Sequence, residues 1–84
     1  MKLWINNLPP HKSDEDVRAF VRKYTRIEIS AMTRIDDDGA SPGVLLEIAG
    51  ASGMLLMGMQ NRLHRMYWEQ RALAVQVMSF ADRG

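Results

Sequence analysis

The residues that most often perform chemistry are scattered along this 84-residue chain, and none has the spacing of a catalytic site. His11 and His64 have no second ligand at the spacing of a metal site. The acidic run "DDDG" lacks the alternating ligands and final glutamate of a calcium loop. There is no Gly-rich phosphate loop, no nucleophile elbow and no cysteine. We therefore expect no enzymatic activity, no metal and no cofactor.

One aromatic residue, Trp4, is predicted to lie on the water-facing side of a strand, where a bound ligand would account for it. In "KLWIN", Leu3 and Ile5 fall on one face of an extended strand, and Lys2, Trp4 and Asn6 fall on the other. The sequence "NLPP" then ends the strand, because two prolines cannot donate to a ladder. A tryptophan on the side that should face water indicates a surface on which a flat ligand stacks.

A helix follows this strand. Ser13 and the acidic residues after it resemble a capping box, since negative charge is favoured at a helix N-terminus. An apolar stripe then recurs at helical spacing, and its members are Val17, Phe20, Val21 and Tyr24.

The pattern then changes to a period of two, which predicts a strand over residues 27–35. Its inward residues would be Ile27, Ile29, Ala31, Thr33 and Ile35, and its outward residues would be Glu28, Ser30, Met32 and Arg34. Turn-forming residues fill positions 36–43, and a second strand is expected over residues 44–48.

The last third of the chain predicts a helix, a small hairpin and a final strand. Ser52 is the expected helix cap, and the apolar stripe comprises Leu55, Leu56, Met59 and Leu63. Gly58 lies inside this helix, where glycine costs about 1 kcal/mol relative to alanine. "MYW" and "EQR" predict the hairpin, and residues 72–78 predict the strand, with Leu73, Val75 and Val77 facing inward.

The resulting order is that of an α+β, ferredoxin-like β-α-β-β-α-β sandwich, a four-stranded antiparallel sheet with both helices on one face. We expect a single domain over residues 1–84, with a core of about residues 2–78 and a tail of residues 79–84. The other sheet face would stay open, with Trp4 beside Leu45.

The composition of the chain limits the classes of partner that we expect. The chain is 46% hydrophobic and 25% charged with a net charge of +1, which is typical of a globular domain and less basic than most electrostatic nucleic-acid binders. The lack of cysteine favours a reducing, intracellular location, either cytoplasmic or nuclear. The longest apolar run, "MLLMGM", is too short to span a bilayer, and no signal peptide is evident, so no membrane partner is expected.

The sequence resembles the RNA-recognition motif (RRM) family. "LWINNL", residues 3–8, matches the family's short RNP motif at all six positions. The longer RNP motif aligns with "SPGVLLEI", where the core positions match. Ser41 replaces the basic residue, and Gly43 and Leu45 replace the two aromatic residues on which bases stack in the family.

The resemblance implies a non-catalytic domain that binds single-stranded RNA, or single-stranded DNA, on the open sheet face, with no small-molecule substrate. Trp4 would stack a base, Lys2 and Arg34 would contact phosphates, and polar or apolar neighbours would complete the surface. The expected RNA-binding residues are Lys2, Trp4, Asn6, Met32, Arg34, Leu45, Gln76 and Met78. The aspartates of residues 36–38 would repel phosphate.

The alternative is a protein-interaction module of the same fold. Some members of the family take a ligand tryptophan between the first helix and an Arg-x-Phe motif before the last strand, which "RMYW" matches imperfectly. The residues of this alternative are Asp14, Glu15, Asp16, Arg65, Tyr67 and Trp68. A homodimer that buries Trp4, Met32 and Leu45 is a second version, and Phe80 of the tail covering Trp4 would make the indole structural.

Overall fold

A computed structural model describes residues 2–35 and 42–78. Along the chain the elements are β1 (Lys2–Asn6), α1 (Asp14–Thr25), β2 (Ala31–Ile35), β3 (Gly43–Glu47), α2 (Gly53–Leu63), β4 (Tyr67–Trp68), β5 (Arg71–Ala72) and β6 (Ala74–Met78). Two predicted features lie outside the described part of the chain. They are the aspartates of residues 36–38 and the tail of residues 79–84, which includes Phe80.

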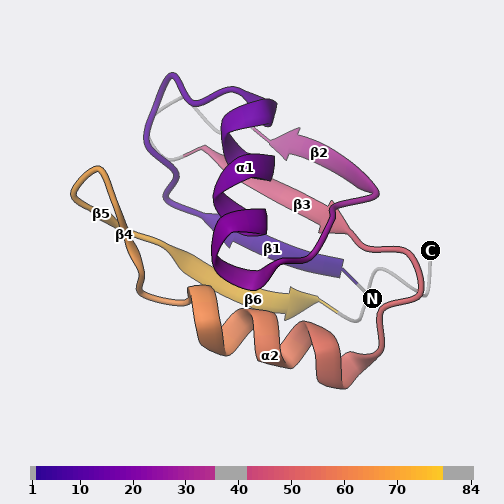
Figure 1. Ribbon diagram of the computed structural model, residues 1–84. Helices are drawn as coiled ribbons and strands as arrows, with labels where there is room; N and C mark the ends of the chain where they lie inside the picture. Colours follow the sequence, from indigo (N-terminus) through magenta and orange to yellow (C-terminus); the bar gives the residue numbers. More distant parts are fainter. Residues whose placement is uncertain (1, 36–41, 79–84) are drawn as a thin grey trace.

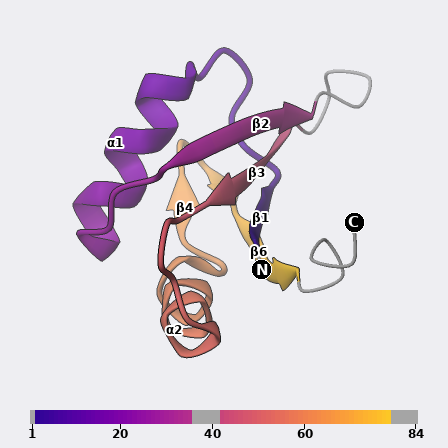
Figure 2. The same cartoon turned by 90° about the vertical axis from the view of Figure 1, so that its right-hand side faces the viewer.

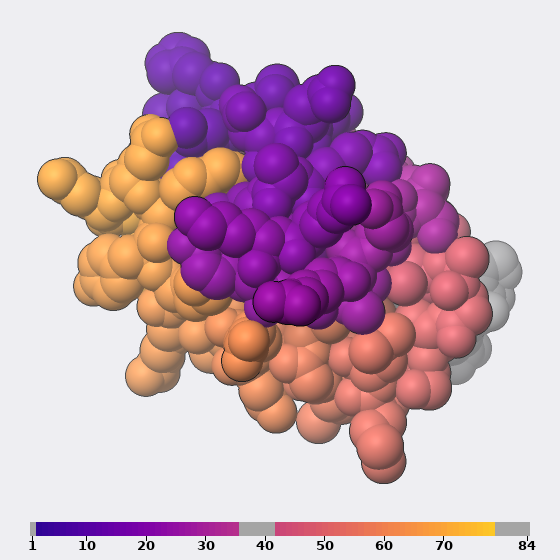
Figure 3. All heavy atoms as spheres, viewed as in Figure 1, coloured from indigo at the N-terminus to yellow at the C-terminus, as the bar shows by residue number. Residues whose placement is uncertain are grey.

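Four strands form one antiparallel sheet in the order β2-β3-β1-β6, and β4 and β5 form a separate hairpin. Both helices lie on the same side of the four-stranded sheet (Figures 1 and 2). The space-filling view of that side shows the end of α1 bordering α2 (Figure 3). The ferredoxin-like sandwich expected from the sequence is therefore confirmed.

The core lies between the helices and the covered sheet face. The alternating residues of β1, β3 and β6 point into it, as the period of two requires. Its buried members are Leu3, Ile5, Leu8, Val17, Val21, Ile29, Val44, Leu46, Leu56, Met59, Leu63, Leu73 and Val75. Phe20 and Tyr24, from the stripe predicted for the first helix, pack against this cluster.

Both helices begin at the predicted serines. The Ser13 hydroxyl accepts a hydrogen bond from the Asp16 backbone N–H at 3.1 Å, and the Asp16 carboxylate accepts one from the Ser13 N–H at 3.1 Å. This reciprocal pair is the predicted capping box. The Ser52 hydroxyl accepts from the Leu55 N–H at 3.1 Å and begins α2 in the same way.

The prediction of one continuous strand over residues 27–35 is wrong in its first half. β2 begins only at Ala31, after Arg26 ends α1 in the left-handed conformation with a φ of 62°. The backbone of Ser30 donates to the Glu47 carbonyl, and its hydroxyl accepts from the Ala49 N–H at 2.7 Å. Ile29 and Met32 both pack into the core although they are three residues apart, so the alternation shifts by one residue at Ser30.

The predicted hairpin is present, but it includes Ala72, so the prediction that the last strand begins at Ala72 is wrong. Its turn residues Glu69 and Gln70 have φ values of 49° and 69°. Positive φ at both central residues is the geometry that matches the twist of a two-residue hairpin. Leu73 is buried between β5 and β6, so the final strand of the sheet begins at Ala74.

Candidate nucleic-acid interface

The strand register defines the sheet face opposite the helices, which we call the open face. Residues that are directly opposite across antiparallel strands point to the same side of a sheet. Three rows cross the open face in the order β2, β3, β1 and β6: Ile35, Gly43, Asn6 and Ala74; Thr33, Leu45, Trp4 and Gln76; and Ala31, Glu47, Lys2 and Met78. Trp4 is central and lies opposite Leu45, as predicted.

The indole of Trp4 extends diagonally over the backbone of Gly43. A Cβ atom built on Gly43 would lie 2.4 Å from Cη2 and 2.7 Å from Cζ2 of Trp4, closer than real Cβ contacts allow. Gly43 is itself buried, and Trp4 is partly buried. The absence of a side chain at Gly43 is therefore what lets the ring lie across β3.

The charges of the open face largely cancel. The Lys2 ammonium lies 3.2 Å from a carboxylate oxygen of Glu47, and both side chains are partly exposed. Other members of the middle row, Thr33, Leu45 and Gln76, are uncharged. The surface around Trp4 is therefore mainly apolar and amide in character, with one cation held beside one anion.

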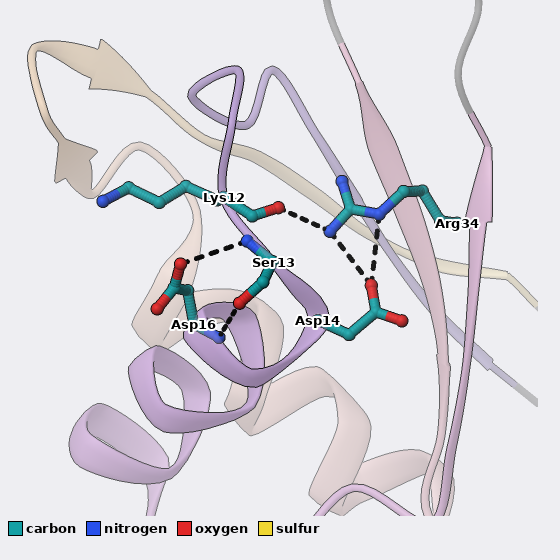
Figure 4. Close-up of polar contacts among 5 residues, drawn as sticks. All are labelled: Lys12, Ser13, Asp14, Asp16 and Arg34. Carbon is teal, nitrogen blue, oxygen red and sulfur yellow. Dashed lines mark hydrogen bonds and ion pairs between the residues drawn. The ribbon is translucent and has the colours of Figure 1, made fainter.

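The prediction that Met32 and Arg34 lie on the open face is wrong, because the shift at Ser30 reverses the two faces of β2. Met32 lies opposite Leu46 and packs against the core. Arg34 turns toward α1, where Nε and Nη2 donate to Oδ1 of Asp14 at 3.1 and 3.0 Å. Nη2 also donates to the Lys12 carbonyl at 2.8 Å (Figure 4). In Figure 4, Arg34 thus connects β2 to the start of α1.

Thr33 is a candidate binding residue that the predicted alternation of residues 27–35 placed on the inward face. It is exposed and lies opposite Leu45 in the row that contains Trp4. Ala31 and Ile35 face the same side, and Ile35 is 44% exposed. The sequence offered one indication, because Ile29 and Met32 are both apolar and cannot share a face in an unbroken strand.

The last two residues of the short motif, Asn7 and Leu8, have structural roles. Asn7 has a φ of 64°, a left-handed conformation that asparagine tolerates better than most residues. Its Nδ2 donates to the Ala72 carbonyl at 3.0 Å, and its Oδ1 accepts from Nη1 of Arg71 at 3.1 Å. Leu8 is fully buried. The contacts of Asn7 anchor the end of β1 to the hairpin.

The residues of the protein-binding alternative make contacts within the chain. Trp68 stacks on Phe20 with ring centroids 4.2 Å apart and an interplanar angle of 15°. The Lys12 ammonium lies 5.4 Å from the Trp68 ring and pairs with Glu69, whose hydrogen bond raises the pKa of Lys12. The place where a ligand aromatic was expected beside the first helix is therefore taken by Trp68.

The acidic residues of this alternative are also largely engaged. Asp14 pairs with Arg34, and hydrogen bonds from Ser13, chiefly from its backbone N–H, lower the pKa of Asp16. Glu15 remains exposed on α1, Arg65 is exposed ahead of the hairpin, and Tyr67 is exposed in β4. Tyr67 is 73% exposed. These residues do not converge on one cavity.

The described residues contain neither a cluster of metal ligands nor a helix that could cross a membrane. Within residues 2–35 and 42–78, no three histidine or acidic side chains are placed so that they could hold a metal ion. No helix in this part of the chain has the length and apolar character required to cross a bilayer.

The comparison with solved structures identifies the fold. No protein-family model and no curated protein matches the sequence. Among solved structures, Pes4 RRM3 is similar with a TM-score of 0.77 and 14% identity, over 93% of this chain and 90% of that chain. The N-terminal three RNA binding domains of the yeast splicing factor Prp24 match with a TM-score of 0.77 and 13% identity, over 93% and 32%.

The RNA recognition domains of Sex-lethal from Drosophila melanogaster match with a TM-score of 0.69 and 21% identity, over 88% of this chain and 46% of that chain. The chain thus spans about a third of the Prp24 structure and just under half of the Sex-lethal structure. At these identities the likeness establishes the fold. The chain has the RNA-recognition-motif fold that its short motif suggested.

Proposed function

We propose that this domain binds single-stranded RNA on its open face, with one base stacked on the indole of Trp4. The observation that carries the proposal is the position of that ring, which lies across β3 in the centre of the open face. Stacking of a base on an aromatic side chain contributes about 1–3 kcal/mol and tolerates any base. The domain is a binding module without a catalytic step.

The packing of Trp4 on Gly43 accounts for the unusual long motif. The resemblance implies a base-stacking aromatic at the position of Gly43, and here the benzene ring of Trp4 lies over that position. One indole from β1 thus covers part of the area that aromatic residues from two strands would provide. We expect a smaller stacking surface and a short bound segment, centred on one base.

Neighbouring side chains supply the remaining contacts. Asn6 and Gln76 flank Trp4 on the open face and can hydrogen-bond to base edges. Leu45 and Met78 provide apolar contact for sugars, and Lys2 provides a cation for a phosphate. Thr33, opposite Leu45, adds a hydroxyl that replaces the contribution first expected from Met32 and Arg34.

The similar structures support the chemical class of the ligand. The Prp24 structure is described as RNA binding domains and the Sex-lethal structure as RNA recognition domains. The same fold in this chain, together with an aromatic residue at the centre of the sheet, favours RNA over a protein as the ligand of the open face. The protein-binding alternative gains no comparable support, because Trp68 already stacks on Phe20.

An NMR titration of the isotopically labelled domain with a pool of randomised short RNAs tests this proposal. We expect chemical-shift changes to concentrate on the open face, at Trp4, Thr33, Leu45 and Gln76. Met32 and Arg34 serve as internal controls because they alternate with Thr33 on the opposite face of the same strand. Shifts confined to the helices, or no shifts at millimolar RNA, would refute the proposal. A parallel DNA pool shows whether the sugar hydroxyl matters.

A further inference from the structure

The second helix, α2, is unusually apolar for a helix on the surface. Over residues 53–63 it contains a single charged residue, Arg62. Leu56, Met59 and Leu63 are buried against the sheet, yet the opposite side also carries large apolar side chains. Met54 is 85% exposed, Met57 is 52% exposed and Leu55 is 37% exposed. A helix that is apolar all round is normally covered on both sides.

A pocket of about 560 Å³ lies between α2 and the end of α1. Tyr24 and Ile27 line it from the α1 side, and Met54, Leu55 and Met59 line it from α2. Figure 3 views the molecule from this side, with the end of α1 next to α2. The volume is in the range of pockets that enclose a bulky side chain or small ligand, and methionines adapt readily to an apolar partner.

Gly58, in the middle of α2, also lines this pocket. A Cβ atom built on Gly58 would meet nothing within 4 Å, so the packing of the domain itself does not require glycine here. Glycine lowers the stability of a helix interior relative to alanine. Glycine at this position leaves the pocket wall without a side chain, so a ligand can approach the backbone of α2 closely.

The charges around the pocket are mainly positive, and the nearest carboxylate in sequence, Glu28, is paired with Arg22 at 3.3 Å. Residues 17–27 and 48–68 contain no aspartate or glutamate. Nε of Arg62 donates to the Tyr24 carbonyl at 2.9 Å and so crosses between the two walls. The Lys23 ammonium lies 5.3 Å from the Tyr24 ring, and Arg26 is exposed at the end of α1. The first turn of α2 has no acidic residue to offset the positive end of its helix dipole.

We propose that this pocket binds an acidic peptide segment of a protein partner, which inserts a bulky apolar side chain between α1 and α2. The basic rim selects for carboxylates, and the apolar lining selects for the inserted side chain. A nucleic-acid backbone would satisfy the rim but offers no aliphatic group for the methionines and leucine. The site lies on the opposite side of the sheet from Trp4, so the proposal does not depend on RNA binding.

Selection from a displayed library of random 12-residue peptides tests the proposal, with the wild-type domain as bait. The matched counter-bait is Gly58→Leu, which fills the pocket from a position with open space around it. We expect enriched peptides to carry net negative charge and at least one large apolar residue. Their affinity should fall by roughly tenfold or more with Gly58→Leu, while that variant melts at an equal or higher temperature because leucine favours helix.

Four controls separate the alternatives. Lys23→Glu should weaken the enriched peptides, and rising salt should do the same because the rim charges are exposed. Met57→Ser, which changes an exposed residue outside the pocket lining, and Trp4→Ala should leave peptide binding unchanged.

Several results would overturn the proposal. One is a selection that yields no peptide able to distinguish wild type from Gly58→Leu. Others are enrichment of basic peptides, or NMR shifts at Tyr24, Met54 and Met59 caused by oligouridine RNA and not by the enriched peptides. The last result would instead assign the basic rim to nucleic acid.

Discussion

At the scale of single residues, Trp4 and Gly43 act as one unit. The indole can lie across β3 only because the position beneath it has no side chain. A substitution at Gly43 therefore alters the stacking surface although Trp4 itself is not replaced.

We expect Gly43→Ala to displace the indole, since the new methyl group would lie 2.4 Å from Cη2. The NMR signal of the Trp4 indole N–H should move, and RNA affinity should fall by about 1 kcal/mol, part of the stacking free energy of one base. Gly58→Ala is the matched control, because a Cβ atom there meets nothing within 4 Å. Retention of both the indole signal and the RNA affinity in Gly43→Ala would show that the ring does not rest on Gly43.

The reversed faces of β2 give a second prediction at this scale. Arg34→Ala should lower the free energy of unfolding by about 1 kcal/mol, since it removes a partly exposed ion pair and a hydrogen bond to the Lys12 carbonyl. RNA affinity should stay within about twofold, or about 0.4 kcal/mol, because Arg34 lies on the face of β2 opposite to Thr33 and Trp4. Thr33→Glu should do the opposite and weaken RNA binding with little effect on stability. Thermal melts and RNA titrations of the two variants measure both effects, and exchanged results would mean that the assigned register is wrong.

At the scale of elements, the start of α1 depends on the capping box of Ser13 and Asp16. Hydrogen bonds from Ser13 lower the pKa of the Asp16 carboxylate in the folded state below its ordinary value of 3.8. A carboxylate with a depressed folded pKa stabilises the fold above its unfolded pKa and loses that contribution as the pH falls through the folded pKa.

We therefore expect Asp16→Asn to be less stable than wild type at pH 7, with the difference shrinking as the pH falls below about 4. Denaturant unfolding of the two proteins between pH 7 and pH 2 measures this. Ser13→Ala removes the hydroxyl that accepts from the Asp16 backbone N–H. This change should lower the free energy of unfolding by about 1 kcal/mol at neutral pH. A stability difference for Asp16→Asn that is independent of pH would show that the carboxylate charge has no role at this cap.

The order of the elements could be predicted from the sequence because each has a local signal. Helical spacing, two serine caps and the turn residues of the hairpin are all written within a few neighbouring positions. The face on which Trp4 lies followed from the alternation of β1, which is unbroken from Lys2 to Asn6, and its central position followed from the predicted order of the strands.

The details that the sequence did not reveal depend on distant contacts. The shift at Ser30 is fixed by hydrogen bonds to Glu47 and Ala49, which lie 17 and 19 residues later in the chain. The contact between Trp4 and Gly43 is a diagonal across two strands, and the stacking of Trp68 on Phe20 joins a hairpin to a helix. Local periodicity cannot specify such pairs, and for that reason Met32 and Arg34 were placed on the wrong face.

At the scale of the whole molecule, the charges are separated although the net charge is only +1. Among the described residues, the one charged residue that lines the α1–α2 pocket is Arg62, with Lys23 and Arg26 nearby on α1, whereas the open face pairs Lys2 with Glu47. The two sides of the sandwich are therefore suited to different ligands, and they should respond differently to salt.

We expect RNA binding on the open face to depend only weakly on salt. Each phosphate neutralised on a single strand contributes about −0.7 to the slope of log K against log salt. With one lysine available, the slope should be about −1 or shallower. Fluorescence anisotropy of a labelled RNA over a range of salt concentrations measures it. A slope of about −3 or steeper would place the RNA against the basic residues around the α1–α2 pocket, and Arg26→Ala would then make the slope shallower.

The most direct test of the central claim compares RNA binding by wild type and Trp4→Ala in the same titration. Loss of one stacked base should reduce affinity by about 1–3 kcal/mol, or roughly 5-fold to 150-fold, while the variant still melts cooperatively. The RNA affinity of Trp4→Phe, which keeps a smaller aromatic ring, should lie between the affinities of wild type and Trp4→Ala. Equal RNA affinity for Trp4→Ala and wild type would contradict the account, because the ring at the centre of the open face would then have no part in binding.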